Sequence, residues 1–144
     1  MNPADELRAA AEALRGLATA ATPGPWRQHD THLGQYGYAA TVLSGEGNDT
    51  DLRAWLPSMS QEPWDETRNV WPDAAYIATM HPGVGKALAD WLETAAHHYE
   101  CGIQAADDVF RNDPAGHKAF LTTGPGAPSP HALAVARAIN GTSP

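Results

Sequence analysis

The sequence holds 7 histidines and a single cysteine, and four of these side chains have spacings at which they could bind a transition metal. His29 and His32 lie three residues apart. His97 and Cys101 are spaced i, i+4, which places both on one face if the segment is a helix. His29 and His32 could bind a metal if the backbone turns locally. His97 and Cys101 would supply half of a zinc site, but no His-Glu-x-x-His or Cys-x-x-Cys motif marks the missing half. We therefore expect solvated histidines and no cofactor, and we keep metal binding by these four residues as a hypothesis.

The sequence holds 5 tryptophans in 144 residues, which is many for this length. Trp91 falls on the apolar stripe of a predicted helix, whereas Trp64 lies in a polar loop and Trp71 precedes Pro72. Exposed aromatic side chains in rigid segments often anchor a protein partner or a flat ligand. We accordingly predict that Trp55, Trp64 and Trp71 bind a partner or ligand, the alternative being that they cover a thin core. No catalytic residue is identified.

Residues 1–22 predict an N-terminal helix that could help to position such side chains. Asn2 can act as its N-cap, and apolar residues recur at helical spacing from Leu7 to Leu17. Arg8 and Arg15 can each form an ion pair with Glu12 inside the helix.

The segment Thr-Pro-Gly-Pro-Trp at residues 22–26 ends this helix. Each proline excludes the residue before it from helical backbone angles, so the chain must turn or extend. Trp26 is the first large side chain after this corner, and we expect its indole to hold the corner against the core.

Residues 26–57 predict a β-rich part. Strand-like runs at 38–43 and 52–56 are separated by the glycine-containing segment 44–49, which indicates a hairpin, and 26–29 is a candidate third strand. Residues 58–69 are expected to form a polar loop.

Residues 73–101 predict a helical part. Asp73 is a candidate N-cap, Pro82-Gly83 breaks the run, and a longer helix with a regular apolar face follows. A Pro/Gly connector at 123–130 then leads to a C-terminal helix at 130–140, for which Ser129 is the candidate cap.

The composition fits a soluble globular protein. A formal net charge of −8 disfavours binding to nucleic acid, and the single cysteine excludes an intramolecular disulfide and suits a reducing compartment. No apolar run approaches the ~20 residues of a membrane span, and no secretory signal is visible. We therefore expect a cytoplasmic protein with a single α+β domain, in which a small antiparallel sheet packs against amphipathic helices.

Two segments together resemble a known family. The first is Ala-Thr-Pro-Gly-Pro-Trp at 21–26 after an amphipathic helix, and the second is Asp-Ala-Ala-Tyr-Ile-Ala at 73–78, followed by Pro82 and a further helix. This pair resembles the Ead-like family of small phage and prophage accessory proteins over about residues 7–26 and 73–93. The resemblance implies residence on a mobile genetic element and an accessory role, and it carries over no active site.

We therefore favour a non-enzymatic accessory protein of a phage, prophage or conjugative plasmid that binds a protein of the host or of the element. One alternative is a protein that sequesters a small ligand, such as a nucleotide, in an aromatic-lined pocket. A metal-dependent hydrolase that uses the histidines and Cys101 is the third hypothesis. The sequence does not indicate an oligomeric state.

Overall fold

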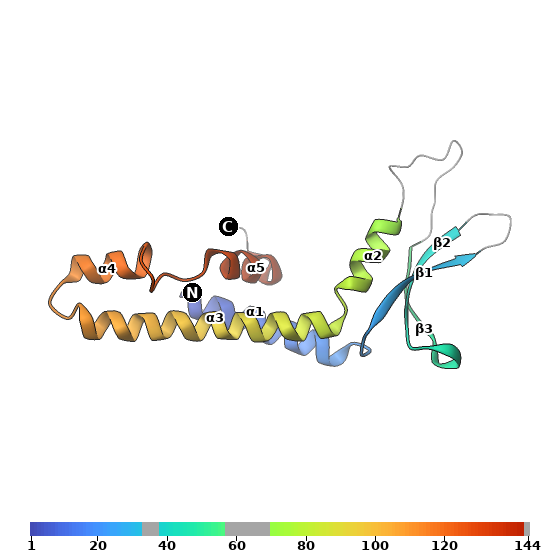
Figure 1. Cartoon of the computed structure of the whole chain (residues 1–144), viewed down its shortest axis with the longest axis horizontal. Coiled ribbons are helices and arrows are strands. Elements are labelled where there is room, and N and C mark those ends of the chain that lie inside the picture. Colours follow the sequence, from blue (N-terminus) through green and yellow to red (C-terminus); the bar gives the residue numbers. More distant parts are fainter. Residues whose placement is uncertain (33–37, 57–69, 143–144) are drawn as a thin grey trace, which may run out of the picture. The chain divides into compact units, whose positions relative to one another are not determined.

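The computed structural model describes residues 1–32, 38–56 and 70–142 (Figure 1). It confirms the α+β class, because α-helices accompany a three-stranded antiparallel sheet. The chain divides into two compact units. The helical unit comprises Met1–Leu17 and Lys86–Pro144, and the sheet unit comprises Ala18–Gly85. That the chain forms a single domain stays a prediction.

The helical unit contains most of α1 (Pro3–Ala20) and α3 (Pro82–Val109), with α4 (Pro114–Thr122) and α5 (Pro130–Asn140). The predicted caps of α1 and α5 are confirmed. Asn2 Oδ1 accepts a hydrogen bond of 3.0 Å from the Asp5 N–H, and Ser129 Oγ accepts one of 3.3 Å from the Ala132 N–H. These bonds satisfy amides that lack a partner within the helix.

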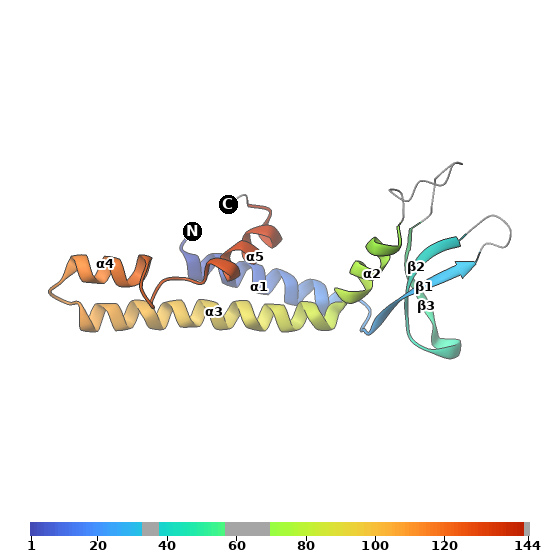
Figure 2. The same ribbon diagram turned by 45° about the horizontal axis from the view of Figure 1, so that its top comes forward.

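The core of the helical unit lies between α1, α3 and α5, which run side by side in both ribbon views (Figure 2). Its buried members are all alanines except Leu7, Leu92 and Leu133. Every buried residue of this cluster is helical, and the expected packing of a helix on the sheet is found for α2 (Trp71–Thr79). Short side chains let helix backbones approach closely, which is why these helices pair with one another.

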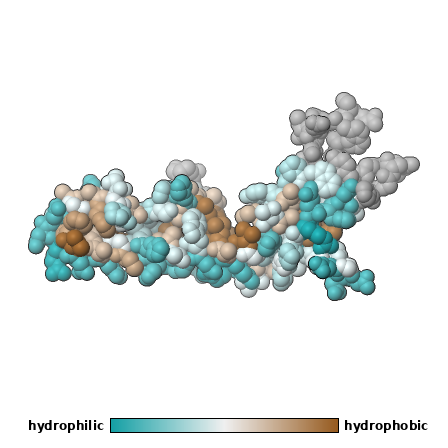
Figure 3. All heavy atoms as spheres, in the orientation of Figure 1, coloured by the Kyte–Doolittle hydropathy of each residue, from teal (hydrophilic) through white to brown (hydrophobic). Residues whose placement is uncertain are grey.

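Two further expectations about the helical faces are wrong. Leu17 is 69% exposed and Trp91 is 42% exposed, so neither is a core residue. Ala89, Leu92 and Ala96 form the buried stripe of α3 instead. In the space-filling view, hydrophobic residues of the helical unit form separate patches on a largely hydrophilic or neutral surface (Figure 3).

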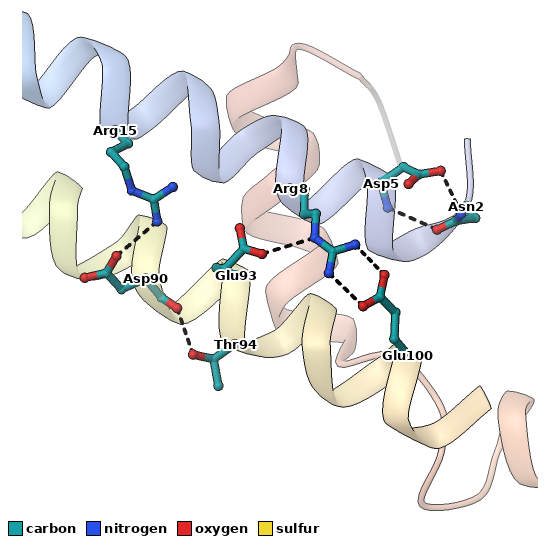
Figure 4. A network of polar contacts seen from close by, with 8 residues as sticks. All are labelled: Asn2, Asp5, Arg8, Arg15, Asp90, Glu93, Thr94 and Glu100. Carbon is teal, nitrogen blue, oxygen red and sulfur yellow. Dashed lines mark hydrogen bonds and ion pairs between the residues drawn. The ribbon is translucent and has the colours of Figure 1, made fainter. Parts of the chain in front are cut away.

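Ion pairs join α1 to α3 (Figure 4). Arg8 Nε lies 3.1 Å from Glu93 Oε1, and the Arg8 guanidinium donates two hydrogen bonds to the Glu100 carboxylate. Arg15 pairs with Asp90 at 3.0 Å. Both arginines therefore reach across to α3 and do not form the predicted pairs within α1. The hydrogen bonds from Arg8 hold the pKa of Glu100 below its ordinary value.

The sheet unit contains β1 (Trp26–His32), β2 (Tyr38–Ser44) and β3 (Asp51–Leu56) in the order β1-β2-β3, with α2 (Trp71–Thr79) packed on β1 and β2. The three predicted strands are confirmed. Between β2 and β3 the chain turns through a short 3-10 helix, η2 (Gly47–Asp49), and Gly45 has a φ of 73°, which favours glycine.

The corner before β1 is held as expected. The Trp26 indole is half-buried, packs against the cluster beneath α2, and donates a hydrogen bond of 3.2 Å to the Thr22 carbonyl. A Cβ atom on Gly24 would lie 2.5 Å from His81 Nδ1, so the corner and the α2–α3 turn are close neighbours. Trp26 also packs against the cluster that contains Ala74 and Ala78, so residues 21–26 and 73–78 meet within the sheet unit.

The predicted bounds of the helical part need correction. α2 begins at Trp71 after Val70 and has no side-chain cap bond, so Asp73 lies in its first turn and is not the N-cap. Pro72 suits this first turn because its missing N–H would have no partner there. α3 continues to Val109, beyond the predicted end at residue 101.

Candidate functional site

The two faces of the sheet have different neighbours. Ala40, Val42 and Ala54 point toward α2 and form a buried or half-buried cluster with it. Because side chains alternate along a strand, the residues between them occupy the opposite face. Among residues 18–32, 38–56 and 70–85, α2 is the only α-helix that lies wholly within the sheet unit, and it packs on the first of these faces.

We call the opposite side the open face, and the strand register defines its rows. His29, Thr41 and Trp55 are aligned across the three strands, and a second row consists of Arg27, Leu43 and Leu52. Cross-strand neighbours in such rows lie within side-chain contact. The open face is therefore formed by these residues together with Thr31, whose hydroxyl lies 3.0 Å from that of Thr41.

Two large apolar side chains are exposed on the open face. Trp55 and Leu52 are each 56% exposed. Thr41 lies between the outer strands and is only 2% exposed, and its hydroxyl donates a hydrogen bond of 2.8 Å to the His29 carbonyl. The central strand thus contributes a hydrogen-bonded hydroxyl to this face, and the two exposed large apolar side chains, Trp55 and Leu52, lie on β3.

A bulge in β3 sets the position of Trp55. The register shifts between Val42 and Leu43, which leaves Arg53 as the extra residue on β3. The Arg53 guanidinium donates a hydrogen bond to Thr22 Oγ1 and lies 3.3 Å from Asp51 Oδ2. Arg53 thereby ties β3 to the proline corner.

The charge of the open face differs from that of the whole chain. Arg27 donates hydrogen bonds to the Gly45 carbonyl and, at 3.2 Å, to Thr50 Oγ1, so its cation is fixed at one end of the face. None of the described residues that form the open face is an aspartate or a glutamate. On a chain with a net charge of −8, this face is a local exception.

The predicted tryptophan anchors have different positions. Trp55 is exposed on the open face. Trp71 is the first residue of α2, is half-buried, and packs against the cluster between α2 and the sheet, while its carbonyl accepts a hydrogen bond of 3.2 Å from Gln28 Nε2. Trp71 therefore covers part of this cluster, which is the alternative that the sequence left open for the tryptophans. Trp64 lies outside the described residues.

The four predicted metal ligands lie on two different elements, β1 and α3. His29 is exposed on the open face, and His32 is the last residue of β1, with a side chain that lies outside the described part. On α3, His97 Nε2 and Cys101 Sγ are 3.6 Å apart, as their spacing predicts. Within residues 1–32, 38–56 and 70–142, no three His, Cys, Asp or Glu side chains are grouped so that they could hold a metal ion. A site formed by all four residues stays a prediction.

Sequence reasoning missed Arg27 and Leu52 as members of the face. Alternation from Trp26 places Arg27 on the side opposite the core. Its alignment with Leu43 and Leu52, however, depends on the strand register and on the bulge at Arg53. A bulge has no reliable signal in a single sequence.

Among the described residues, no helix has the length and apolarity needed to cross a membrane. Comparison with protein-family models, with curated proteins and with solved structures gives no match for this chain.

Proposed function

We propose that this chain is a non-enzymatic accessory protein of a phage, prophage or conjugative plasmid, and that it binds a protein of the host or of the element in the cytoplasm. The observation that carries this proposal is the open face, where Trp55 and Leu52 are each 56% exposed beside a buried Thr41. The resemblance of residues 21–26 and 73–78 to the Ead-like family supports the link to a mobile element.

The open face has the properties of a preformed binding surface. A tryptophan buries a large apolar area on binding and loses little conformational entropy, which is why it is frequent among the residues that dominate binding energy. Trp55 stands on a paired strand, so little backbone ordering is required when a partner binds.

The charges on the open face indicate the chemistry of the partner. Arg27 and His29 lie on it, and the described residues of this face include no carboxylate. A complementary protein would present an apolar centre to Trp55 and Leu52, with acidic side chains near Arg27. A nucleic acid is a less suitable partner because a chain with a net charge of −8 repels phosphates at longer range.

Site-specific photo-crosslinking in the native cell tests this proposal. We expect a photoreactive amino acid at position 55 to give one discrete protein adduct that resists nuclease treatment. The matched control is position 76, since Tyr76 is 69% exposed on α2 of the same unit. It should not give that adduct.

The purified pair then gives the energetic test. Trp55→Ala should weaken the measured affinity at least about 30-fold, the effect of a residue worth ~2 kcal/mol, whereas Tyr76→Ala should change it less than about threefold. Equal effects of the two variants would contradict the proposal, as would an adduct that disappears after nuclease treatment. Circular dichroism of both variants confirms that the sheet is retained.

A further inference from the structure

A second feature of the molecule, in the helical unit, is a cavity of about 400 Å³ between α3 and the connector from α4 to α5. One face of α3 forms its first wall with Trp91, Thr94, Ala95, His98 and Tyr99. These residues recur at helical spacing over two turns, so they line one continuous strip. The volume is near the lower end of the range of about 300–1,000 Å³ that small-molecule sites occupy.

The opposite wall of the cavity is the connector, which contributes Pro125, Pro128 and Ser129. In both ribbon views this segment runs alongside α3 (Figures 1 and 2). Prolines restrict the backbone here, so the wall is stiff in the absence of any ligand.

Glycines fix the connector close to α3. A Cβ atom on Gly102 would lie 3.0 Å from the Gly126 carbonyl oxygen, and one on Gly126 would lie 2.2 Å from the Phe120 ring. The Gly126 N–H also donates a hydrogen bond of 3.2 Å to the Phe120 carbonyl. Residues 123–130 therefore have a defined path, and the cavity is preformed.

Aromatic and uncharged groups dominate the lining. Trp91, His98 and Tyr99 provide three aromatic rings, and Trp91 is 42% exposed although it stands on the longest helix of the unit. None of the described residues that line the cavity is Lys, Arg, Asp or Glu. A phosphate or carboxylate in the cavity would therefore lack a fixed counter-charge, which disfavours charged ligands.

The Thr94 and Ser129 hydroxyl groups of the lining supply an acceptor and a donor. The Thr94 hydroxyl donates a hydrogen bond of 2.9 Å to the Asp90 carbonyl, so its lone pairs remain to accept a bond. Ser129 Oγ accepts a hydrogen bond from the Ala132 N–H, so its O–H can donate. A flat ring with both donors and acceptors on its edge matches this arrangement.

We propose that this cavity binds an uncharged heteroaromatic ring compound of the size of a free nucleobase, stacked on the Trp91 indole. Thr94 and Ser129 would recognise the polar edge of the ring, and Ala95 would form the floor. This site lies in a different unit from the open face and is independent of the proposed protein binding.

NMR of the full chain tests the proposal, with adenine, nicotinamide and indole as uncharged probes and adenosine monophosphate as the charged one. We expect at least one uncharged probe to bind saturably and to shift the Trp91 indole resonance, which is identified with Trp91→Phe. Adenosine monophosphate should bind at least tenfold more weakly than that probe. No saturable binding of the three uncharged probes would overturn the proposal, as would equally tight binding of adenosine monophosphate.

Two variants and a matched control locate the binding. Trp91→Ala removes the stacking surface, and Ala95→Leu fills part of the cavity. Each variant should bind the probe at least tenfold more weakly than the unchanged protein does. Ala105→Leu makes the same change at an exposed position of α3 and should leave the affinity unchanged. Full affinity in either cavity variant, or an equal loss in Ala105→Leu, would refute the assignment. Circular dichroism shows whether each variant remains folded.

Discussion

The alanine-rich core of the helical unit leads to a specific prediction for Leu92. This side chain has no exposed surface, and its neighbours in the cluster between α1, α3 and α5 are mostly alanines. Leu92→Ala removes the contacts of one isobutyl group and leaves a cavity. Buried Leu→Ala changes cost about 2–5 kcal/mol, and the cost rises with the volume that stays empty.

We expect a cost in the upper part of that range, about 3–5 kcal/mol. An alanine has no side-chain rotamers with which to fill a cavity, so the three helices could relieve the void only by moving as rigid elements. Domains of ordinary stability unfold at a cost of about 5–15 kcal/mol, so this loss would be a large share of the total.

Equilibrium unfolding in urea, followed by far-ultraviolet circular dichroism, measures the difference. Leu17→Ala is the matched control because Leu17 is a leucine of α1 that is 69% exposed, and it should change the free energy of unfolding by less than about 0.5 kcal/mol. A Leu92→Ala cost below about 1 kcal/mol, or one equal to that of Leu17→Ala, would refute the packing of α3 in this core.

Three further predictions concern the ion pair, the β2–β3 turn and the core. The ion pair with Arg8 lowers the pKa of Glu100 in the folded state. The ion pair therefore stabilises the fold fully above the ordinary pKa of 4.5, and this stabilisation is lost as the pH falls through the lower folded-state pKa. Urea unfolding at a series of pH values should show this loss, and Glu100→Gln should make the decline less steep. Gly45→Ala should cost at least about 1 kcal/mol in the same assay, because φ is 73° and the added Cβ would lie 2.1 Å from the Asp49 carbonyl oxygen; an unchanged unfolding midpoint would exclude this turn. Ala96→Leu should cost about 1–3 kcal/mol by overpacking, whereas Ala105→Leu should be nearly neutral, and a reversed order would place the wrong face of α3 in the core.

Local sequence signals predicted most elements of this fold, although they did not indicate α4 (Pro114–Thr122). Proline and glycine at residues 22–25 and 82–83 mark where helices end and begin, and strand-like runs bounded by glycines gave the β2–β3 hairpin. The contact by which the Trp26 indole holds the proline corner against the core was also predicted, because Trp26 directly follows that corner. These features depend on residues that are close together in the chain, which is why one sequence is sufficient to predict them.

Interactions between distant residues were predicted poorly. Arg8 has a suitable partner four residues away, yet it bonds to Glu93 and Glu100 because α3 brings two carboxylates to it. Trp91 has the spacing of a core residue but lines a cavity, because alanines at 89 and 96 already fill the contact with the other helices. Helical periodicity identifies an apolar face, but not which part of it another element covers.

In the candidate site, too, local features were predicted and interactions between distant residues were not. Trp55 was predicted as an anchor because tryptophans are frequent in this sequence, whereas its row with His29 and Thr41 depends on a register that includes a bulge at Arg53.

The solvent accessibility of the Trp55 indole in the intact chain tests most directly whether the open face is available to a partner. Indole N–H resonances can be assigned by NMR with Trp55→Phe and Trp26→Phe and then followed with a soluble paramagnetic agent. We predict strong relaxation of Trp55, which is 56% exposed, and weak relaxation of Trp26, whose indole N–H donates a hydrogen bond to the Thr22 carbonyl. If Trp55 were as protected as Trp26, the chain itself would cover the open face, and the surface proposed for partner binding would not exist.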